Sequence, residues 1–152
     1  TRDDGHSPAV SGSGAVSRVA GEGDVGVAPP GEQVAMWCRA LAAFPAATPK
    51  YVVLQGCHSG GFAEALARVP GLVGLMAARR DRTSFGCDPG QEMTFFGAIY
   101  GRLLADRLAA GGQPPAIDWA GLFAALSAEV AAAEARHDVL PSLPVFVRGP
   151  EG

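Results

Sequence analysis

The segment Tyr51–Phe62, YVVLQGCHSGGF, constrains the fold more than any other part of the chain. It opens with a run of β-branched and aromatic residues after Pro49, which is typical of a short strand covered on both faces of a parallel sheet. The glycine pair at 60–61 then allows a tight turn. Apolar residues recur with helical spacing over 62–69. The segment therefore predicts a strand, a turn and a helix in succession.

Cys57 follows the expected strand and precedes the expected helix. In open α/β sheets, ligands and reacting groups gather at the carboxyl edge of the strands. The amino terminus of a helix also favours the reactive thiolate form of a cysteine. A cysteine is more often a small buried hydrophobe, but the order of strand, cysteine and glycines favours a nucleophile here.

The rest of the chain predicts helices and strands in alternation. Helices are expected over 32–44 and 94–110 and from an N-cap at Asp118, and strands over 72–77 and 145–147, with a loop-rich stretch over 1–30 that holds one short strand near 15–20. This order predicts a single α/β domain over residues 1–152, with a mostly parallel sheet and helices on both faces.

Composition narrows the classes of function. The chain has 152 residues, of which 48% are hydrophobic and 18% are charged, so it is expected to bury a sizeable core. A net charge of -3 gives no reason to expect a nucleic-acid partner. No apolar run approaches the ~20 residues of a membrane span. The three cysteines form no C-x-x-C pair, so no disulfide framework, metal site or cofactor is predicted.

Two blocks resemble cysteine peptidases of the caspase and haemoglobinase clan, and within it the legumain-like branch with its bacterial members. LQGCHSGGF, at 54–62, is similar to the nucleophile strand and turn of these enzymes, with Cys57 at the catalytic position. LMAARRDRTSFGC, at 75–87, continuing into TFFG at 94–97, resembles the next strand and the substrate-binding loop. PSLPVFVRG, at 141–149, is similar to the closing strand. The resemblance implies a three-layer caspase-like fold that lacks its first strands here.

The same resemblance implies a cysteine endopeptidase that acts on a peptide or protein substrate. A thiolate at Cys57 would attack the peptide carbonyl, a histidine would carry the proton, and backbone N–H groups would hold the oxyanion. Gln55, Gly56 and Ser84 match positions that bind the substrate. Ordinary loop polarity is the alternative interpretation of Gln55 and Ser84.

None of the three histidines is followed by glycine, so the residue sequence leaves two candidates for the catalytic histidine. His6 lies upstream of Cys57, and TRDDGH resembles the loop that follows the family's His-Gly pair. The base is therefore either His6 or a histidine that precedes Thr1 in a longer, truncated or processed protein. His58 adjoins Cys57, where side chains rarely converge, and His137 is expected in the last turn of a helix.

Two other functions stay open. One is a catalytically inactive or truncated relative that acts as a binding module, which the missing His-Gly pair favours. The other is a serine hydrolase, because CHSGG is one residue away from the G-x-S-x-G nucleophile elbow. In that case Ser59 would be the nucleophile and His137 the base, although Cys57 would crowd the strained turn.

Overall fold

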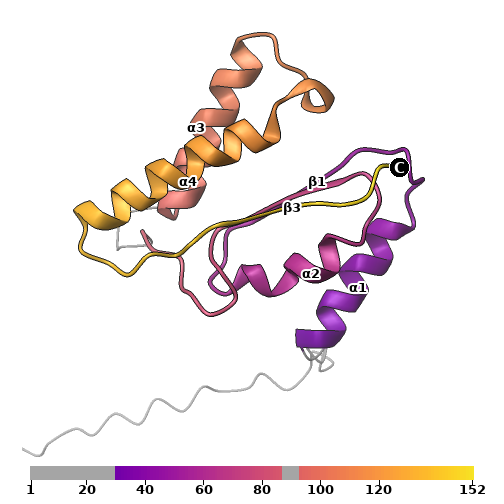
Figure 1. Ribbon diagram of the computed structural model, residues 1–152, viewed down its shortest axis with the longest axis horizontal. Helices are drawn as coiled ribbons and strands as arrows, with labels where there is room; N and C mark the ends of the chain where they lie inside the picture. The colour runs from indigo at the N-terminus through magenta and orange to yellow at the C-terminus, as the bar shows by residue number, and fades with distance from the viewer. Residues whose placement is uncertain (1–29, 87–92) are drawn as a thin grey trace, which may run out of the picture.

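The computed structural model describes residues 30–86 and 93–152, and Figure 1 shows how their elements are arranged. His6, Cys87 and the strand expected near 15–20 lie outside these residues. The elements, in chain order, are α1 (Pro30–Ala42), β1 (Lys50–Leu54), the 3-10 turn η1 (Ser59–Phe62), α2 (Ala63–Leu66), β2 (Leu72–Met76), α3 (Phe95–Ala109), the 3-10 turn η2 (Pro114–Ala116), α4 (Trp119–Arg136) and β3 (Val145–Arg148).

The fold is α/β, with helices on both faces of the sheet as expected. In Figure 1, α3 and α4 lie on one side of the strands and α1 and α2 on the other. Successive side chains of a strand point to opposite faces of the sheet, so alternate residues of the central strand, β2, pack against different helices. Val73 and Leu75 join the core formed with α3 and α4. Leu72 and Met76 join the core on the side of α1 and α2.

The expectation of a mostly parallel sheet is wrong. The described strands lie in the order β1-β2-β3, and β1 pairs with β2 in parallel, but β2 pairs with β3 antiparallel. The reason is that two helices, not one, separate β2 from β3. The ring of Phe95 at the start of α3 meets His137 at the end of α4, so these helices are antiparallel. After α4 the chain has therefore returned to the sheet edge at which β2 ended. β3 begins at that edge and must be antiparallel to β2.

Helix ends follow the expected capping chemistry. The side chain of Asp118 accepts a hydrogen bond from the N–H of Gly121, 2.9 Å away, which confirms it as an N-cap. Thr94 accepts from Gly97 in the same way at α3. The helix expected over 62–69 is shorter than its spacing suggested, because Phe62 ends η1, only Ala63–Leu66 is α-helical, and residues 67–69 form a turn and a bend. Among the described helices, none combines the length and the hydrophobicity that a membrane span requires.

Candidate functional site

Cys57 lies just beyond the carboxyl end of β1, where its side chain is exposed. Its closest polar partner is Ser84, in the segment that follows β2. The Ser84 N–H donates to Cys57 Sγ at 3.3 Å, and the thiol donates to the Ser84 carbonyl oxygen at 3.6 Å. Two segments that follow neighbouring parallel strands therefore meet at this sulfur.

The turn after Cys57 is fixed by backbone hydrogen bonds rather than by a long helix. His58 has a φ of 59°, in the left-handed region. Its N–H donates to the Arg82 carbonyl oxygen at 2.8 Å, and its ring Nδ1 lies 3.1 Å from the Arg80 carbonyl oxygen. A 3-10 turn and a single α-helical turn follow, so little helix dipole acts at the sulfur.

Gly60 is the residue that allows this turn to pack against the chain after β2. Its N–H donates to the Ala78 carbonyl oxygen at 2.7 Å. A Cβ at Gly60 would lie 2.8 Å from both the Ala78 oxygen and the Arg80 nitrogen, closer than real Cβ atoms approach. At Gly61 a Cβ would meet nothing within 4 Å. Only the first glycine of the pair is thus required by packing.

Ser59 has the environment of a structural hydroxyl. The residue is only 5% exposed. Its Oγ accepts from the Ala78 N–H at 3.3 Å and lies 3.5 Å from the Ala78 carbonyl oxygen. Both contacts tie η1 to the segment that follows β2, and neither involves a histidine, so this arrangement gives no support to Ser59 as a nucleophile.

The residues predicted to bind substrate lie around the same edge, but they do not all meet. Ser84 touches Cys57 through its backbone. Gln55 and Gly56 are exposed in the segment that joins β1 to Cys57. The Gln55 carboxamide packs against Gly97 in the first turn of α3, so closely that a Cβ at Gly97 would collide with it. Gln55 is therefore directed toward α3 in this structure.

A cavity of about 420 Å³ opens beside the cysteine. One wall comes from Cys57 and the turn that follows it, and the other from the first turn of α1. Its lining residues are Gly31, Gln33, Val34, Cys57, His58, Gly61 and Phe62. Sequence reasoning missed the contribution of α1, because nothing in residues 31–34 carries a recognisable chemical signal.

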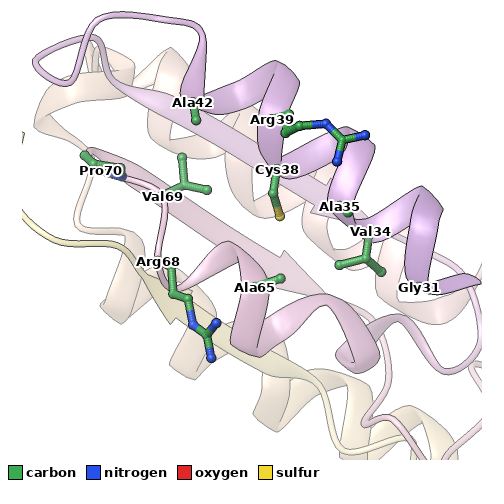
Figure 2. A pocket seen from close by; sticks show the side chains of 10 residues that line it. All are labelled: Gly31, Val34, Ala35, Cys38, Arg39, Ala42, Ala65, Arg68, Val69 and Pro70. Atoms are coloured by element: carbon green, nitrogen blue, oxygen red, sulfur yellow. The ribbon is translucent and has the colours of Figure 1, made fainter.

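A second cavity, of about 450 Å³, lies between α1 and α2 and does not include Cys57 (Figure 2). Val34 and Cys38 point from α1 toward α2 in this view, whereas the guanidinium of Arg68 points away from α1. Cys38 is half-buried and packs against the core on this side of the sheet. The two cavities share Gly31 and Val34, so the first turn of α1 separates them.

The described histidines are held by other groups. The ring of His137, at the carboxyl end of α4, lies 4.8 Å from that of Phe95, and the ring of His58 faces the Arg80 carbonyl. In residues 30–86 and 93–152, neither ring hydrogen-bonds Cys57 Sγ. The same residues contain no group of three or more His, Cys, Asp or Glu side chains that could hold a metal ion. His6, the predicted base, is not among them.

An ion pair braces the segment that receives the His58 hydrogen bonds. Arg79 Nη2 donates to Asp81 Oδ2 at 2.8 Å, and Arg79 Nε donates to Oδ1. This hydrogen bonding from Arg79 is the main reason that the pKa of Asp81 falls to about 2 from its ordinary value of 3.8. The pKa of Arg79 rises for the same reason. The carbonyls that hold His58 thus belong to a short turn closed by a charged pair.

No protein-family model, no curated protein and no solved structure matches this chain. The likeness to legumain-like peptidases therefore depends on the residue blocks around Cys57 and after β2. The features available for a functional proposal are the position of Cys57 at a strand end, its contact with Ser84, and the cavity beside it.

Proposed function

We propose that this chain is a cysteine endopeptidase, or the cysteine-bearing part of one, with a three-layer caspase/haemoglobinase-like fold. The observation that carries the proposal is the position of Cys57. It is exposed at the carboxyl edge of the parallel pair β1 and β2, and it lines a cavity of about 420 Å³. This edge is where open α/β sheets place reacting groups. Most free cysteines are buried instead.

The proposed reaction is peptide-bond hydrolysis in two steps. The Cys57 thiolate forms a C–S bond to the substrate carbonyl carbon, and the peptide C–N bond breaks as a histidine delivers its proton to the leaving amine. Water then attacks the thioester, the histidine takes the water's proton, and the acid product leaves as the thiol is restored. The base is His6 or a histidine that precedes Thr1. Gln55, Gly56 and Ser84 are the proposed substrate-binding residues, beside a peptide in the Cys57 cavity.

A binding module without catalysis is the second candidate, and one observation favours it. Both described histidine rings are engaged elsewhere, His58 with the Arg80 carbonyl and His137 with Phe95. A thiol without a base reacts slowly at neutral pH, because little of it is thiolate. Such a chain would bind an extended peptide at the same cavity without cleaving it.

Cys57 and Cys38 provide a matched pair for the test, since one is exposed and the other half-buried. We expect iodoacetamide to label Cys57 at least about tenfold faster than Cys38 at pH 6 to 7, as read by mass spectrometry. We also expect Cys57→Ala to abolish cleavage of a mixed peptide library, with Cys38→Ala retaining it.

Cleavage by the Cys57→Ala variant would overturn the proposal. Equal labelling of the two cysteines, together with no cleavage by the unaltered chain, would instead favour the binding module. Binding of uncleaved library peptides that is lost when Cys57 is alkylated would place that module at the same cavity.

A further inference from the structure

Glu134, in the last turn of α4, is buried although it carries a carboxyl group. The residue is 3% exposed, whereas the side chain of Glu129 on the same helix is 45% exposed and pairs with Arg102. A buried polar group is costly unless it is hydrogen-bonded. Oε1 of Glu134 accepts a hydrogen bond from the Ser142 N–H, 3.0 Å away. The buried carboxyl group therefore has a specific partner in the loop that joins α4 to β3 (Figure 1).

This loop contains strained backbone directly after Ser142. Leu143 has a φ of 54°, in the left-handed region that a leucine rarely adopts. Burial does not hold it there, because Leu143 is 40% exposed. Such a conformation persists only where neighbouring contacts fix the chain. The hydrogen bond from Ser142 to Glu134 is one of these contacts.

Ser142 is also bonded to the segment that follows β2. Its carbonyl oxygen accepts from the Arg79 N–H at 2.9 Å. This bond lies three residues beyond the last pair of the β2–β3 ladder, Met76 with Val145, so it continues the antiparallel register. Ser142 thus connects the end of α4, through its N–H, to the chain after β2, through its carbonyl group.

The segment that begins at Arg79 holds the cysteine. The turn over residues 79–82 is closed by a 2.9 Å hydrogen bond between its first and last residues, and its last carbonyl accepts from the His58 N–H. Two residues farther on, the Ser84 N–H donates to Cys57 Sγ at 3.3 Å. A continuous series of hydrogen bonds and short backbone segments therefore leads from the Glu134 carboxyl group to the sulfur.

We infer that Glu134 is a positioning residue for the Cys57 thiol. Its carboxyl group fixes Ser142, the Ser142 carbonyl fixes Arg79, and the turn that starts at Arg79 sets the place of the sulfur. Glu134 is not among the described residues that line the Cys57 cavity, so it acts only through these backbone groups. The inference rests on the proposed function, because it assigns Glu134 a part in the reaction of Cys57.

This role requires an acceptor oxygen at the reach of a glutamate side chain, and it does not require a negative charge. Glu134→Gln keeps the length of the side chain and the acceptor Oε1. Glu134→Asp keeps the charge but is one methylene shorter, so the buried Ser142 N–H should lose its partner. The two substitutions therefore separate the acceptor from the charge.

Peptide cleavage and iodoacetamide labelling of Cys57 test the inference. We expect Glu134→Asp to lower kcat about 10- to 100-fold, with KM changed by about twofold or less, because a nucleophile displaced by about 1 Å reacts far more slowly. Labelling of Cys57 relative to Cys38 should fall at least about threefold, because the sulfur loses the N–H that favours its thiolate. Glu134→Gln should retain both rates to within about twofold. Glu129→Asp, the same change at an exposed position of α4, is the matched control and should alter neither rate.

Amide exchange in the unaltered chain shows directly whether the hydrogen bonds form. We expect the Ser142 and Arg79 amides to exchange at least about 100-fold more slowly than amides of an unstructured peptide. In Glu134→Asp the Ser142 amide should lose this protection, and in Glu134→Gln it should keep it.

Unchanged kcat and unchanged Cys57 labelling in a folded Glu134→Asp variant would overturn the inference and leave the proposed function intact. Fast exchange of the Ser142 amide in the unaltered chain would also overturn it, and so would an equal loss of activity in Glu134→Gln. A Glu134→Asp chain that does not fold would overturn it as well, since Glu134 would then hold the whole fold rather than the turn beside Cys57. If the unaltered chain cleaves no peptide, the proposed function fails, and the labelling rates alone decide whether Glu134 positions the sulfur.

Discussion

The two ends of β1 are built in opposite ways. At the amino end, Lys50 is only 6% exposed, and its Nζ donates to three carbonyl oxygens, those of Pro45 at 3.1 Å and of Thr48 and Pro70 at 2.9 Å each. At the carboxyl end, four successive residues, Gln55 to His58, are all exposed. One end of the strand is closed by a buried cation, and the other presents a thiol beside a cavity.

The amino end of β1 therefore contributes to the stability of the fold, whereas the carboxyl end presents the group that is proposed to react. A buried ammonium group that satisfies three carbonyls fixes the loops around it, because unpaired buried carbonyls would be costly. At the exposed end, only the backbone has to be held in place. The backbone hydrogen bonds that His58 and Gly60 donate to the segment after β2 do this. Substitutions at the amino end should therefore change mainly the free energy of unfolding, and substitutions at the carboxyl end should change mainly the reactivity of Cys57.

Lys50→Met should have the largest effect on stability. It keeps a long side chain but removes the donor shared by three carbonyls, so we expect a loss of about 2–4 kcal/mol in the free energy of unfolding. Urea denaturation measures this loss. Arg68→Met is the matched control, because Arg68 is an exposed cation that pairs with the exposed Glu64, and its replacement should change stability by at most about 0.5 kcal/mol. Equal stability of the two variants would mean that the amino end is not held by Lys50.

Gly60→Ala should have the second-largest effect on stability, and it should also change the reactivity of Cys57. The added Cβ would press on backbone atoms of Ala78 and Arg80, which have little room to move, so we expect a loss of about 1–3 kcal/mol. Displacing this turn should also change the rate at which Cys57 is alkylated. Gly61→Ala, which adds the same methyl group into open space, should alter stability by about 0.5 kcal/mol or less. If the two alanine variants behave alike, the close approach at Gly60 does not hold the turn.

Much of the fold could be predicted because the helices carry strong local signals. The residues spaced along α4, Trp119, Leu122, Leu126 and Val130, are all buried, and its predicted N-cap is present. The direction of β3 could not be predicted in the same way. It depends on α3 and α4 forming an antiparallel pair, and no periodicity within either helix encodes that pairing.

The site was predictable only where it is local in sequence. The order of strand, cysteine and glycines placed Cys57 correctly after β1. The cavity wall from α1 and the burial of Lys50 both arise from segments that meet only in the folded chain. Lysine side chains are mostly exposed and are almost never buried without partners. The sequence alone therefore gave no reason to expect that the chain's only lysine would be buried against three carbonyl oxygens. His6 stays a prediction, since it lies outside the described residues.

The smallest expected effect concerns the ion pair at the exposed end. Because hydrogen bonding from Arg79 lowers the pKa of Asp81 in the folded protein to about 2, the pair stabilises the fold above about pH 4. That contribution is lost as the pH falls from about 4 to about 2. An NMR titration of the Asp81 carboxyl should show a midpoint of about 2, and Arg79→Gln should return it toward 3.8. Arg80→Gln is the control and should leave the midpoint in place.

A midpoint near 3.8 in the unaltered chain would show that the pair does not form in solution. Both side chains are about half exposed, at 47% and 55%, so water and salt screen their attraction. Arg79→Gln should therefore change the stability of the whole chain much less than Lys50→Met does. A comparable loss would mean that the turn over residues 79–82 holds the fold together as firmly as the buried lysine, and the contrast between the two ends of β1 would fail.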